Sequence, residues 1–432
     1  MYDILLTELL TISLFKKILS DSAVKNLVLL LQLMRKSDSD LEDMIKAYCS
    51  VYSKLIDSMQ HPDFYEHVSN LLLYDENPFT LACERKELCE KEFLKEQTER
   101  EYSILERLAV VPCSYLKNKL KEKSSANDTD GAKLTQIIDN LPEWNPGALE
   151  KHDKNLNMMI PERINAYEKN GSGIFLKHSF FVWNGELKQI TPVENPDLIT
   201  LDRLYLVDSQ KEMVIKNTDT FLNGLPANNI LLYGDRGTGK SSMVKAIVNR
   251  FSHLGLRLVE ISCRNLDHIP EITSRLHIRG VKFILFIDDL AFENNEEKYT
   301  ALKGVLEGGI EHKPENVLLY ATSNRRHLIK ETFSDRKGLS SDNPDEEIRA
   351  RDNIQEKLSL SDRFGITVVF TSPIKKEYLQ VVHKMAEEED INIDPSLLEQ
   401  KAMQWELTYN GMTPRTARQF INWLKGELLF KV

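Results

Sequence analysis

Eight consecutive residues have the types and spacing of a loop that binds phosphate groups. The segment Gly234–Ser241 reads Gly-Asp-Arg-Gly-Thr-Gly-Lys-Ser and fits the pattern G-x-x-x-x-G-K-[ST]. Glycines let the backbone curl until its N–H groups point at phosphate oxygens, Lys240 supplies a cation, and Ser241 supplies a hydroxyl for Mg²⁺. The residues predicted to contact nucleotide here are Gly234, Asp235, Arg236, Gly237, Thr238, Gly239, Lys240, Ser241 and Ser242.

Two adjacent carboxylates form the second candidate group. Asp288 and Asp289 directly follow the apolar run Phe283–Ile287. In an open parallel sheet, the carboxyl ends of the strands lie beside the phosphate loop. We therefore expect Asp288 to hold Mg²⁺, directly or through water, and Asp289 to orient or deprotonate an attacking water. The alternative is a solvated turn after a strand.

The surrounding sequence predicts the elements that position these groups. The apolar run Asn229–Tyr233 before the loop is typical of a buried parallel strand, and Ser242–Leu254 after it has apolar residues at helical spacing. The later elements alternate, with strands expected at 256–262, 281–287, 316–322 and 366–370 and helices at 266–276, 297–306 and 348–358. This alternation predicts an α/β domain with a parallel, helix-covered sheet over 196–371.

The chain before this domain is expected to be mainly helical. Apolar residues recur every three or four positions, as at Leu5, Leu9 and Ile12, which predicts a helical N-terminal domain over 1–140. An ordinary helical core explains such stripes, and a partner-binding surface is the alternative. The polar segment 121–133 is expected to be an exposed loop.

Two flanking segments carry their own signals. An Asn184-Gly185 pair between apolar runs predicts a β-hairpin, inside a linker over 141–195. Asp208 or Ser209 is expected to cap the helix that follows the linker. Three capping residues stand directly before prolines and predict three helices in a C-terminal lid over 372–432, at Ser372-Pro373, Asp394-Pro395 and Thr413-Pro414.

Composition and charge limit the classes of function. The 432 residues carry a formal net charge of -10, which argues against broad coating of nucleic acid but leaves a local basic patch open. The five cysteines and ten histidines have no disulfide-type or metal-type spacing, so we expect a reducing compartment and no structural zinc. No segment resembles a signal peptide or is long enough to cross a bilayer, so we expect a cytoplasmic protein with no membrane contact.

The order of these motifs resembles that of the AAA+ ATPases. In that superfamily a doubly wound five-stranded parallel sheet carrying the phosphate loop is followed by a helical lid, and the resemblance covers about residues 196–432. The phrases Asn228–Gly234 and Ala321–Leu328 are most similar to a bacterial family of predicted ATPases known as domain-of-unknown-function family 815. The resemblance implies ATP and Mg²⁺ as ligands, and a homo-oligomeric ring or open spiral.

The resemblance also implies roles for single residues. Asn324 matches sensor 1, which positions the lytic water and senses the γ-phosphate. Arg363 matches the arginine finger that reaches the next subunit's nucleotide, and Arg415 matches sensor 2 on the γ-phosphate. Leu206 and Val207 lie in a segment that resembles the lining of the adenine pocket.

Two departures from the superfamily pattern bear on mechanism. Asp289 stands where glutamate is usual and is shorter by one methylene, so we expect slow hydrolysis or a site tuned for switching. The stretch Cys263–His268 lacks an aromatic-x-Gly pore loop, which disfavours a protein-threading machine. The arginines interpreted as surface or lid-packing residues are Arg325, Arg326 and Arg418.

The expected function is ATP-driven remodelling of an unidentified protein partner that the N-terminal domain selects. A nucleotide-gated adaptor with little hydrolysis is one alternative. A DNA-associated loader is another, although the sequence has no basic stripe to support it.

Overall fold

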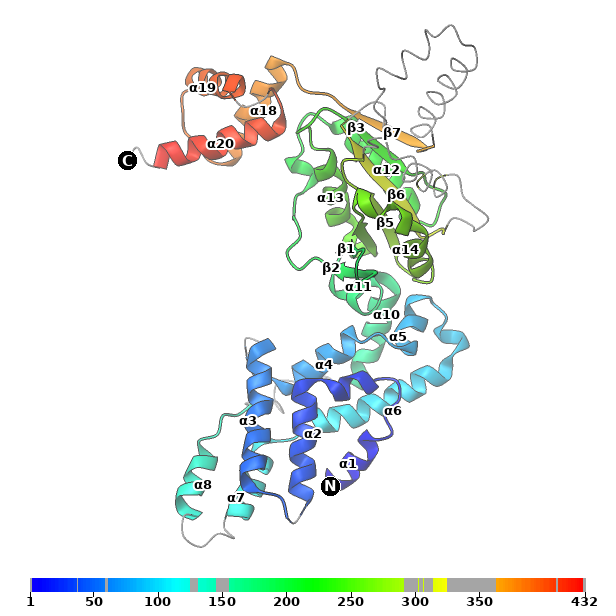
Figure 1. Ribbon diagram of the computed structural model, residues 1–432, viewed down its shortest axis with the longest axis vertical. Coiled ribbons are helices and arrows are strands. Elements are labelled where there is room, and N and C mark those ends of the chain that lie inside the picture. The colour runs from blue at the N-terminus through cyan, green and yellow to red at the C-terminus, as the bar shows by residue number, and fades with distance from the viewer. Residues whose placement is uncertain are drawn as a thin grey trace. The chain divides into compact units, whose positions relative to one another are not determined.

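The computed structural model describes residues 2–36, 38–58, 61–124, 131–144, 155–290, 302, 306, 314–324, 363–408 and 411–429. The chain divides into two compact units, Met1–Lys177 and His178–Val432 (Figure 1). The boundary between them falls inside the segment 141–195 that the sequence assigned to a linker. The helices expected at 297–306 and 348–358 lie outside the described residues, apart from Leu302 and Leu306.

The described part of the N-terminal unit is helical, in agreement with the sequence pattern. Its α-helices are α1 Tyr2–Leu9, α2 Ser22–Arg35, α3 Leu41–Ser58, α4 Phe64–Tyr74, α5 Pro78–Glu84, α6 Glu92–Ala109, α7 Cys113–Ser124, α8 Gly131–Asp139, α10 Ile160–Asn170 and α11 Ile174–Lys177. Leu5, Leu9 and Ile12 are buried in its core. The loop expected at 121–133 was wrong at both ends, because α7 continues to Ser124 and α8 begins at Gly131, and the residues between them lie outside the described ranges.

Buried polar groups connect the helices of this unit. The Glu101 carboxylate of α6 accepts hydrogen bonds from the backbone N–H groups of Ser13, Leu14 and Phe15, at 2.8–3.2 Å. It thereby satisfies the backbone of the chain segment that follows α1. Arg163 of α10 donates to the Tyr102 hydroxyl at 2.8 Å. These charged groups are buried together with hydrogen-bond partners, as stable burial of a charge requires.

The second unit contains a seven-stranded sheet whose strand order is β2-β1-β4-β5-β6-β3-β7. The strands are β1 Phe180–Asn184, β2 Gln189–Pro192, β3 Ile230–Gly234, β4 Leu256–Glu260, β5 Lys282–Ile287, β6 Val317–Ser323 and β7 Ile366–Phe370. All five strands expected from the sequence are present and parallel. The predicted doubly wound α/β fold is therefore confirmed.

The β-hairpin accounts for the two additional strands. β1 pairs antiparallel with β2, and it also pairs parallel with β4, where Phe180 lies opposite Leu258. The hairpin is thus part of the sheet and was wrongly assigned to a linker. It covers an edge of the apolar β4 that would otherwise stay unpaired. Phe181 and Trp183 of β1 are buried accordingly.

Helices cover the sheet, and one of them begins at Lys240, inside the phosphate loop. Residues of β3 to β7 pack with α12 Asp208–Leu222 and α13 Lys240–Phe251 in one apolar core, and α14 Ile269–Leu276 also has a buried apolar face. Neither Asp208 nor Ser209 caps α12, because the helix already begins at Asp208 and Val207 precedes it without a capping side chain. Strand register and helix packing together set the ends of β3, β5 and β6 side by side.

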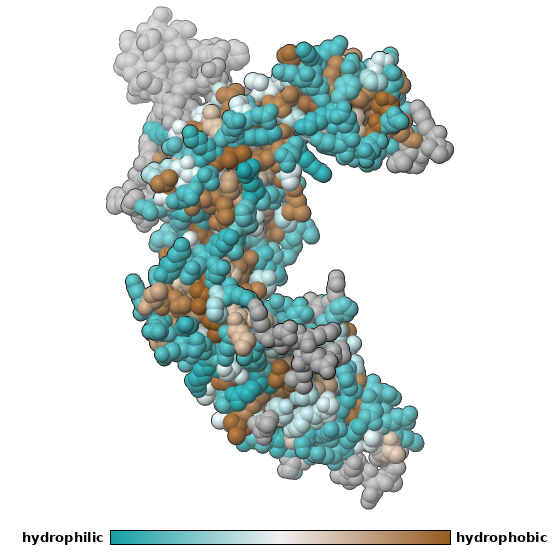
Figure 2. Space-filling view, turned by 180° about the vertical axis from the view of Figure 1, so that it is seen from behind, coloured by the Kyte–Doolittle hydropathy of each residue, from teal (hydrophilic) through white to brown (hydrophobic). Residues whose placement is uncertain are grey.

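Three helices form the lid, as predicted: α18 Lys375–Glu388, α19 Pro395–Thr408 and α20 Pro414–Leu429. Asp394 and Thr413 accept backbone N–H bonds at the starts of α19 and α20, as their positions before proline suggested. The Ser372-Pro373 signal was wrong, because α18 begins later and Glu377 accepts from the Ile374 N–H instead. Figure 2 shows hydrophilic and apolar side chains mixed over the lid surface.

Candidate nucleotide-binding site

The phosphate loop connects β3 to α13 through a backbone that only glycine tolerates at several points. Gly237 and Gly239 have φ values of 77° and 97°, and Gly239 directly precedes the first residue of α13. At Gly234 a Cβ atom would lie 1.8 Å from the Phe370 carbonyl oxygen of β7. The loop therefore packs directly on the neighbouring strand and opens onto a helix N-terminus, which attracts anions.

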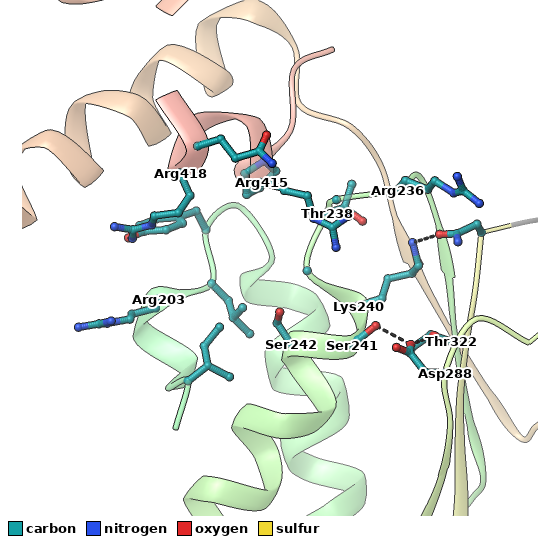
Figure 3. A pocket seen from close by; sticks show the side chains of 18 of the residues that line it. Arg203, Arg236, Thr238, Lys240, Ser241, Ser242, Asp288, Thr322, Arg415 and Arg418 are labelled. Atoms are coloured by element: carbon teal, nitrogen blue, oxygen red, sulfur yellow. Dashed lines mark hydrogen bonds between the residues drawn. The ribbon is translucent and has the colours of Figure 1, made fainter. Parts of the chain in front are cut away.

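Lys240 is buried at the centre of this edge. Its Nζ donates to the Gly234 and Asp235 carbonyl oxygens at 2.9 and 2.6 Å, and to Asn324 Oδ1 at 2.9 Å. Figure 3 shows Lys240 near Ser241 and Asp288, which are joined by a hydrogen bond. Burial lowers the pKa of the Lys240 ammonium, while the nearby carboxylates of Asp235, Asp289 and Asp288 act in the opposite direction. The lysine is thus held by neutral oxygens across the place where the motif predicts phosphate.

The two carboxylates at the end of β5 are joined to β6 and α13 by short hydrogen bonds. Asp288 Oδ1 accepts from Ser241 Oγ and from Thr322 Oγ1, each at 2.6 Å. The backbone N–H of Asp289 donates to Thr322 Oγ1 at 2.8 Å, and Asn324 Nδ2 donates to Asp289 Oδ1 at 2.6 Å. Thr322 therefore orients both acidic residues. Asp289 has a φ of 52°, which turns its side chain at the end of the strand.

The donor set at this edge fits Mg²⁺. The Ser241 hydroxyl and the Asp288 carboxylate are adjacent hard oxygen ligands. Within the described ranges, no group of three or more His, Cys, Asp and Glu side chains is arranged to hold a metal ion. Mg²⁺ commonly takes only one or two ligands from a protein and the rest from phosphates and water, so Ser241 and Asp288 would be a sufficient protein share.

A cavity of about 540 Å³ lies over the loop. The residues that line it come from the sheet edge, from the segment before α12 and from the lid: Ile199, Arg203, Leu204, Tyr205, Arg236, Gly237, Thr238, Gly239, Lys240, Ser241, Ser242, Asp288, Asp289, Thr322, Asn324, Met385, Pro414, Arg415, Arg418 and Gln419. Most of the sequence-predicted nucleotide contacts therefore meet at one cavity. Gly234 and Asp235 instead contribute the backbone oxygens that hold Lys240.

The segment expected to line the adenine pocket reaches the cavity, but through different residues. Leu204 and Tyr205 are in the cavity wall. Leu206 is 43% exposed with a φ of 60°, and Val207 is buried in the core under α12. Leu206 and Val207 are thus not among the residues that line the cavity, and the positive φ at Leu206 accompanies this change in the direction of the side chains.

The lid meets this segment through a charged cluster. The Tyr205 hydroxyl donates to Glu388 Oε2 at 2.5 Å, and Arg418 donates to the Tyr205 oxygen at 3.2 Å and to Glu389 at 3.0 Å. Burial, and next to it the Glu388 carboxylate, raises the pKa of Tyr205 to about 12. Arg418, interpreted from sequence as a surface or packing residue, thus lines the cavity as well as connecting the lid.

The remaining candidate arginines lie in different places. Arg415 lines the cavity, and its backbone N–H donates to the Gly237 carbonyl oxygen at 3.3 Å. Arg363 precedes β7 and therefore lies at the amino end of that strand, whereas the phosphate loop follows the carboxyl end of the parallel strand β3. Arg325 and Arg326 fall outside the described residues.

Sequence reasoning missed several lining residues. Thr322 had a usable signal, because it stands two residues before Asn324 and side chains two apart on a strand share a face. Glu260, at the end of β4, was also missed. Burial, and then the charge of Asp288, raises the pKa of the Glu260 carboxyl. Glu260 is therefore close enough to Asp288 to be affected by its charge, although it does not line the cavity. Ile199, Arg203, Met385 and Gln419 lie outside any motif.

The parallel sheet, its phosphate loop and the helical lid together define an AAA+ ATPase-like fold. The chain belongs to the family described as "Protein of unknown function (DUF815)", which matches residues 176–428. The finer family resemblance read from the sequence is thereby confirmed. A comparison with curated proteins finds no match.

Solved structures with a similar fold include a branch migration motor and an AAA domain. The RuvB Holliday junction branch migration motor of Thermotoga maritima is 17% identical, with 54% of this chain and 65% of that chain covered and a TM-score of 0.36. The FIGL-1 AAA domain in complex with ADP is 19% identical, with 52% and 72% covered and a TM-score of 0.33. This chain thus spans less than two thirds of the RuvB chain. Similarities this distant carry no argument about function.

Proposed function

We propose that this protein binds ATP with Mg²⁺ over the phosphate loop and hydrolyses it. The observation that best supports this is the convergence of Lys240, Ser241, Asp288 and the lid residue Arg415 around one cavity. A cation, a helix N-terminus, a hydroxyl with a carboxylate, and a second cation on a separate helical body are the parts that phosphoryl transfer to water needs.

Each residue has a role that follows from its position. The N–H groups at Gly237 to Gly239 and the Lys240 ammonium bind the β- and γ-phosphates, and Lys240 gives up its internal oxygen partners as it does so. Ser241 and Asp288 hold Mg²⁺, which neutralises charge on the phosphates when bound. Arg415 approaches the γ-phosphate from the lid. Leu204 and Tyr205 are proposed to face the base.

Water activation rests on Asp289 and Asn324. Asn324 contacts both Lys240 and Asp289, so it links the phosphate-binding cation to the carboxylate. Asp289 accepts the proton or orients the water, and Asn324 positions that water beside the γ-phosphate. Since aspartate is shorter than glutamate, we propose a slow hydrolase. Arg363, which precedes the amino end of β7, is proposed to act on a neighbouring subunit's nucleotide in a ring or spiral.

One observation favours a second candidate function. The Asp289 carboxylate already accepts a hydrogen bond from Asn324 at 2.6 Å, which occupies one of the acceptor sites that an attacking water would use. A protein that binds ATP tightly, changes the position of its lid and rarely hydrolyses would use the same contacts as a nucleotide-gated adaptor. Multiple-turnover phosphate release by the full-length protein separates the two functions.

The remaining parts of the proposal concern location and partners. Among the residues that the structure describes, no helix is long and apolar enough to span a membrane. We propose a cytoplasmic protein whose helical N-terminal unit selects a protein partner for remodelling. A DNA-associated role is less well supported, given the net charge of -10, and salt-dependent DNA binding would revive it.

The direct test is isothermal calorimetry with ATP and Mg²⁺, followed by measurement of phosphate release. We expect saturable binding with one nucleotide per chain, and turnover that rises with protein concentration as subunits assemble. A parent protein that binds no ATP under these conditions would overturn the proposed function.

A further inference from the structure

Asp235 forms hydrogen bonds through both its backbone and its side chain, although the loop motif requires no particular side chain there. Its backbone N–H donates to the Phe370 carbonyl oxygen of β7 at 3.1 Å. Its backbone oxygen accepts from Lys240 Nζ at 2.6 Å and from Thr238 Oγ1 at 2.8 Å. Its carboxylate accepts from the backbone N–H of Ser372 at 2.9 Å. One residue thus joins the sheet, the phosphate-binding lysine and the chain that leads to the lid.

The hydrogen bond between Asp235 and Ser372 lies in the segment that connects the sheet to the lid. Ser372 is two residues past the end of β7 and three before the start of α18, so it belongs to the strand-to-lid connection. Hydrogen bonds from the Ser372 side chain and backbone N–H lower the pKa of Asp235, which is consistent with a maintained charge-assisted contact. Any displacement of Asp235 therefore acts directly on the segment that sets the direction of the lid.

The same loop also contacts the last lid helix. The Gly237 carbonyl oxygen accepts from the Arg415 N–H at 3.3 Å. A Cβ atom at Gly237 would lie 2.9 Å from Thr413 Oγ1 and 3.2 Å from the Arg415 Cβ. The loop is therefore in contact with the start of α20 as well as with the connection before α18. The phosphate loop therefore contacts the lid at two places that are far apart in the lid sequence.

We propose that Asp235 is a positioning residue that couples the phosphate loop to the lid through Ser372, so that phosphate binding at the loop is transmitted to α18. This inference rests on the proposed binding of ATP at the loop. When phosphate draws Lys240 away from the Asp235 carbonyl oxygen, the loop loses an internal bond and shifts, and the carboxylate carries that shift to Ser372. The negative charge of the Asp235 carboxylate would repel a phosphate bound nearby and so weaken ATP binding. We therefore expect Asp235 to contribute to the coupling between the loop and the lid, and not to ATP affinity.

The test measures lid order by hydrogen exchange and mass spectrometry on the full-length protein, with and without Mg²⁺ and a non-hydrolysable ATP analogue. In the parent protein, we expect the analogue to protect amides in α13 and in α18. In Asp235→Ala, protection of α13 should persist with an affinity within roughly threefold of the parent, because only an exposed carboxylate is lost. Protection of α18 should fall to a minor fraction, and turnover should decrease roughly tenfold, as loss of one charge-assisted hydrogen bond predicts.

Three further variants separate coupling from general damage. Asp235→Asn keeps an oxygen that can accept from Ser372 and should retain most of the α18 protection. Ser372→Pro removes the N–H donor from the other side of the contact and should reproduce the Asp235→Ala result, while leaving the phosphate loop intact. Thr371→Ala changes the exposed neighbour in the same connection and should behave as the parent.

The outcomes are distinguishable. Full protection of α18 in Asp235→Ala and Ser372→Pro would overturn the coupling. If Asp235→Ala fails to fold or to bind, Ser372→Pro alone decides the question by the same readout. A parent protein that does not bind the analogue would instead contradict the proposed function. In that case the parent would show no protection with which the variants could be compared.

Discussion

The two ends of the cavity hold their residues by different kinds of contact. At the phosphate end, Lys240, Asp288 and Asn324 form hydrogen bonds of 2.6–2.9 Å with backbone carbonyls and side chains of the phosphate loop, of α13 and of the ends of β5 and β6. At the lid end, Arg418 and Glu389 form an ion pair in which both side chains are about 30% exposed. The first kind of contact joins backbone atoms and mostly short side chains that have few rotamers, whereas the second joins long side chains that have many.

This difference has an energetic consequence. Lys240 is buried, so removing one of its partners leaves a costly unsatisfied group, whereas an ion pair between partly exposed long side chains contributes little. We infer that the phosphate end keeps one geometry and that the lid end can exchange partners as the lid moves. Substitutions at the two ends should therefore differ greatly in their effect, and the following predictions test that contrast.

The largest effect on ATP affinity is expected for Lys240→Ala. This change removes the main cation from the phosphates and also leaves the Gly234 and Asp235 carbonyl oxygens without their donor. We expect ATP affinity to fall by about 100-fold or more, equivalent to two charge-assisted hydrogen bonds. Calorimetry with ATP and Mg²⁺ measures the loss. Unchanged affinity, in a variant that remains folded by circular dichroism, would contradict the assignment of this loop.

Arg363→Ala tests a residue that belongs to neither end of its own cavity. Arginine fingers accelerate other phosphate-loop enzymes by roughly 10³–10⁵, and we expect a large loss of turnover with ATP affinity retained. Mixing this variant with Lys240→Ala should restore part of the activity. The mixture forms interfaces in which an intact loop from one chain meets an intact Arg363 from the other.

The mixing experiment has a clear contrary outcome. If the mixture stays inactive and the parent's turnover per chain is independent of protein concentration, the protein acts as a monomeric switch. Arg363 would then have a role within its own chain.

Asp289→Asn addresses the chemical step at the phosphate end. ATP should still bind, because the loop, Lys240 and Ser241 are unchanged, while turnover should fall by roughly 10²-fold or more when the proton acceptor is lost. Rapid-quench measurement of phosphate formation, together with binding calorimetry, separates the two steps. Turnover near the parent rate would mean that another group activates the water. Glu260 would then be the first residue to examine, because the charge of Asp288 acts on its carboxyl group.

The same contrast explains which features could be predicted from sequence. The phosphate loop is continuous, and its glycines, lysine and serine have fixed spacing, so Gly234–Ser241 was recognisable without any structure. The α/β fold could also be predicted, because the alternation of apolar strands and helices is likewise a pattern of neighbouring segments along the chain. The proposed roles of Asp289, Asn324, Arg363 and Arg415 stay predictions, although three of the four line the cavity.

The lid end could not be predicted because its contacts are distant in sequence. Tyr205 meets Glu388 and Arg418, which lie 183 and 213 residues away. No local pattern specifies such pairs. The hairpin posed a related difficulty: Asn184-Gly185 indicates a turn, but the pairing of β1 with β4 depends on which sheet edge is unpaired. Leu206 and Val207 were chosen by resemblance, and the positive φ of Leu206 that turns the chain was not apparent from its type.

The smallest effect is expected for Arg418→Ala at the lid end. Arg418 lines the cavity, but its partners Tyr205 and Glu389 keep other contacts: Tyr205 with Glu388, and Glu389 with Lys425 at 2.8 Å. Because these pairs are partly exposed, we expect ATP affinity to weaken only about two- to fivefold. Lys425→Ala is the matched control, since Lys425 shares Glu389 but does not line the cavity, and it should leave affinity unchanged.

Calorimetry on both variants at low and high salt completes this comparison. The Arg418→Ala deficit should shrink as salt rises, because screening already weakens the contact in the parent. A loss approaching that of Lys240→Ala, and independent of salt, would mean that Arg418 binds nucleotide directly with its full charge. The lid end would then hold its ligand as firmly as the phosphate end, and the proposed division of the cavity into a fixed end and an adjustable end would be wrong.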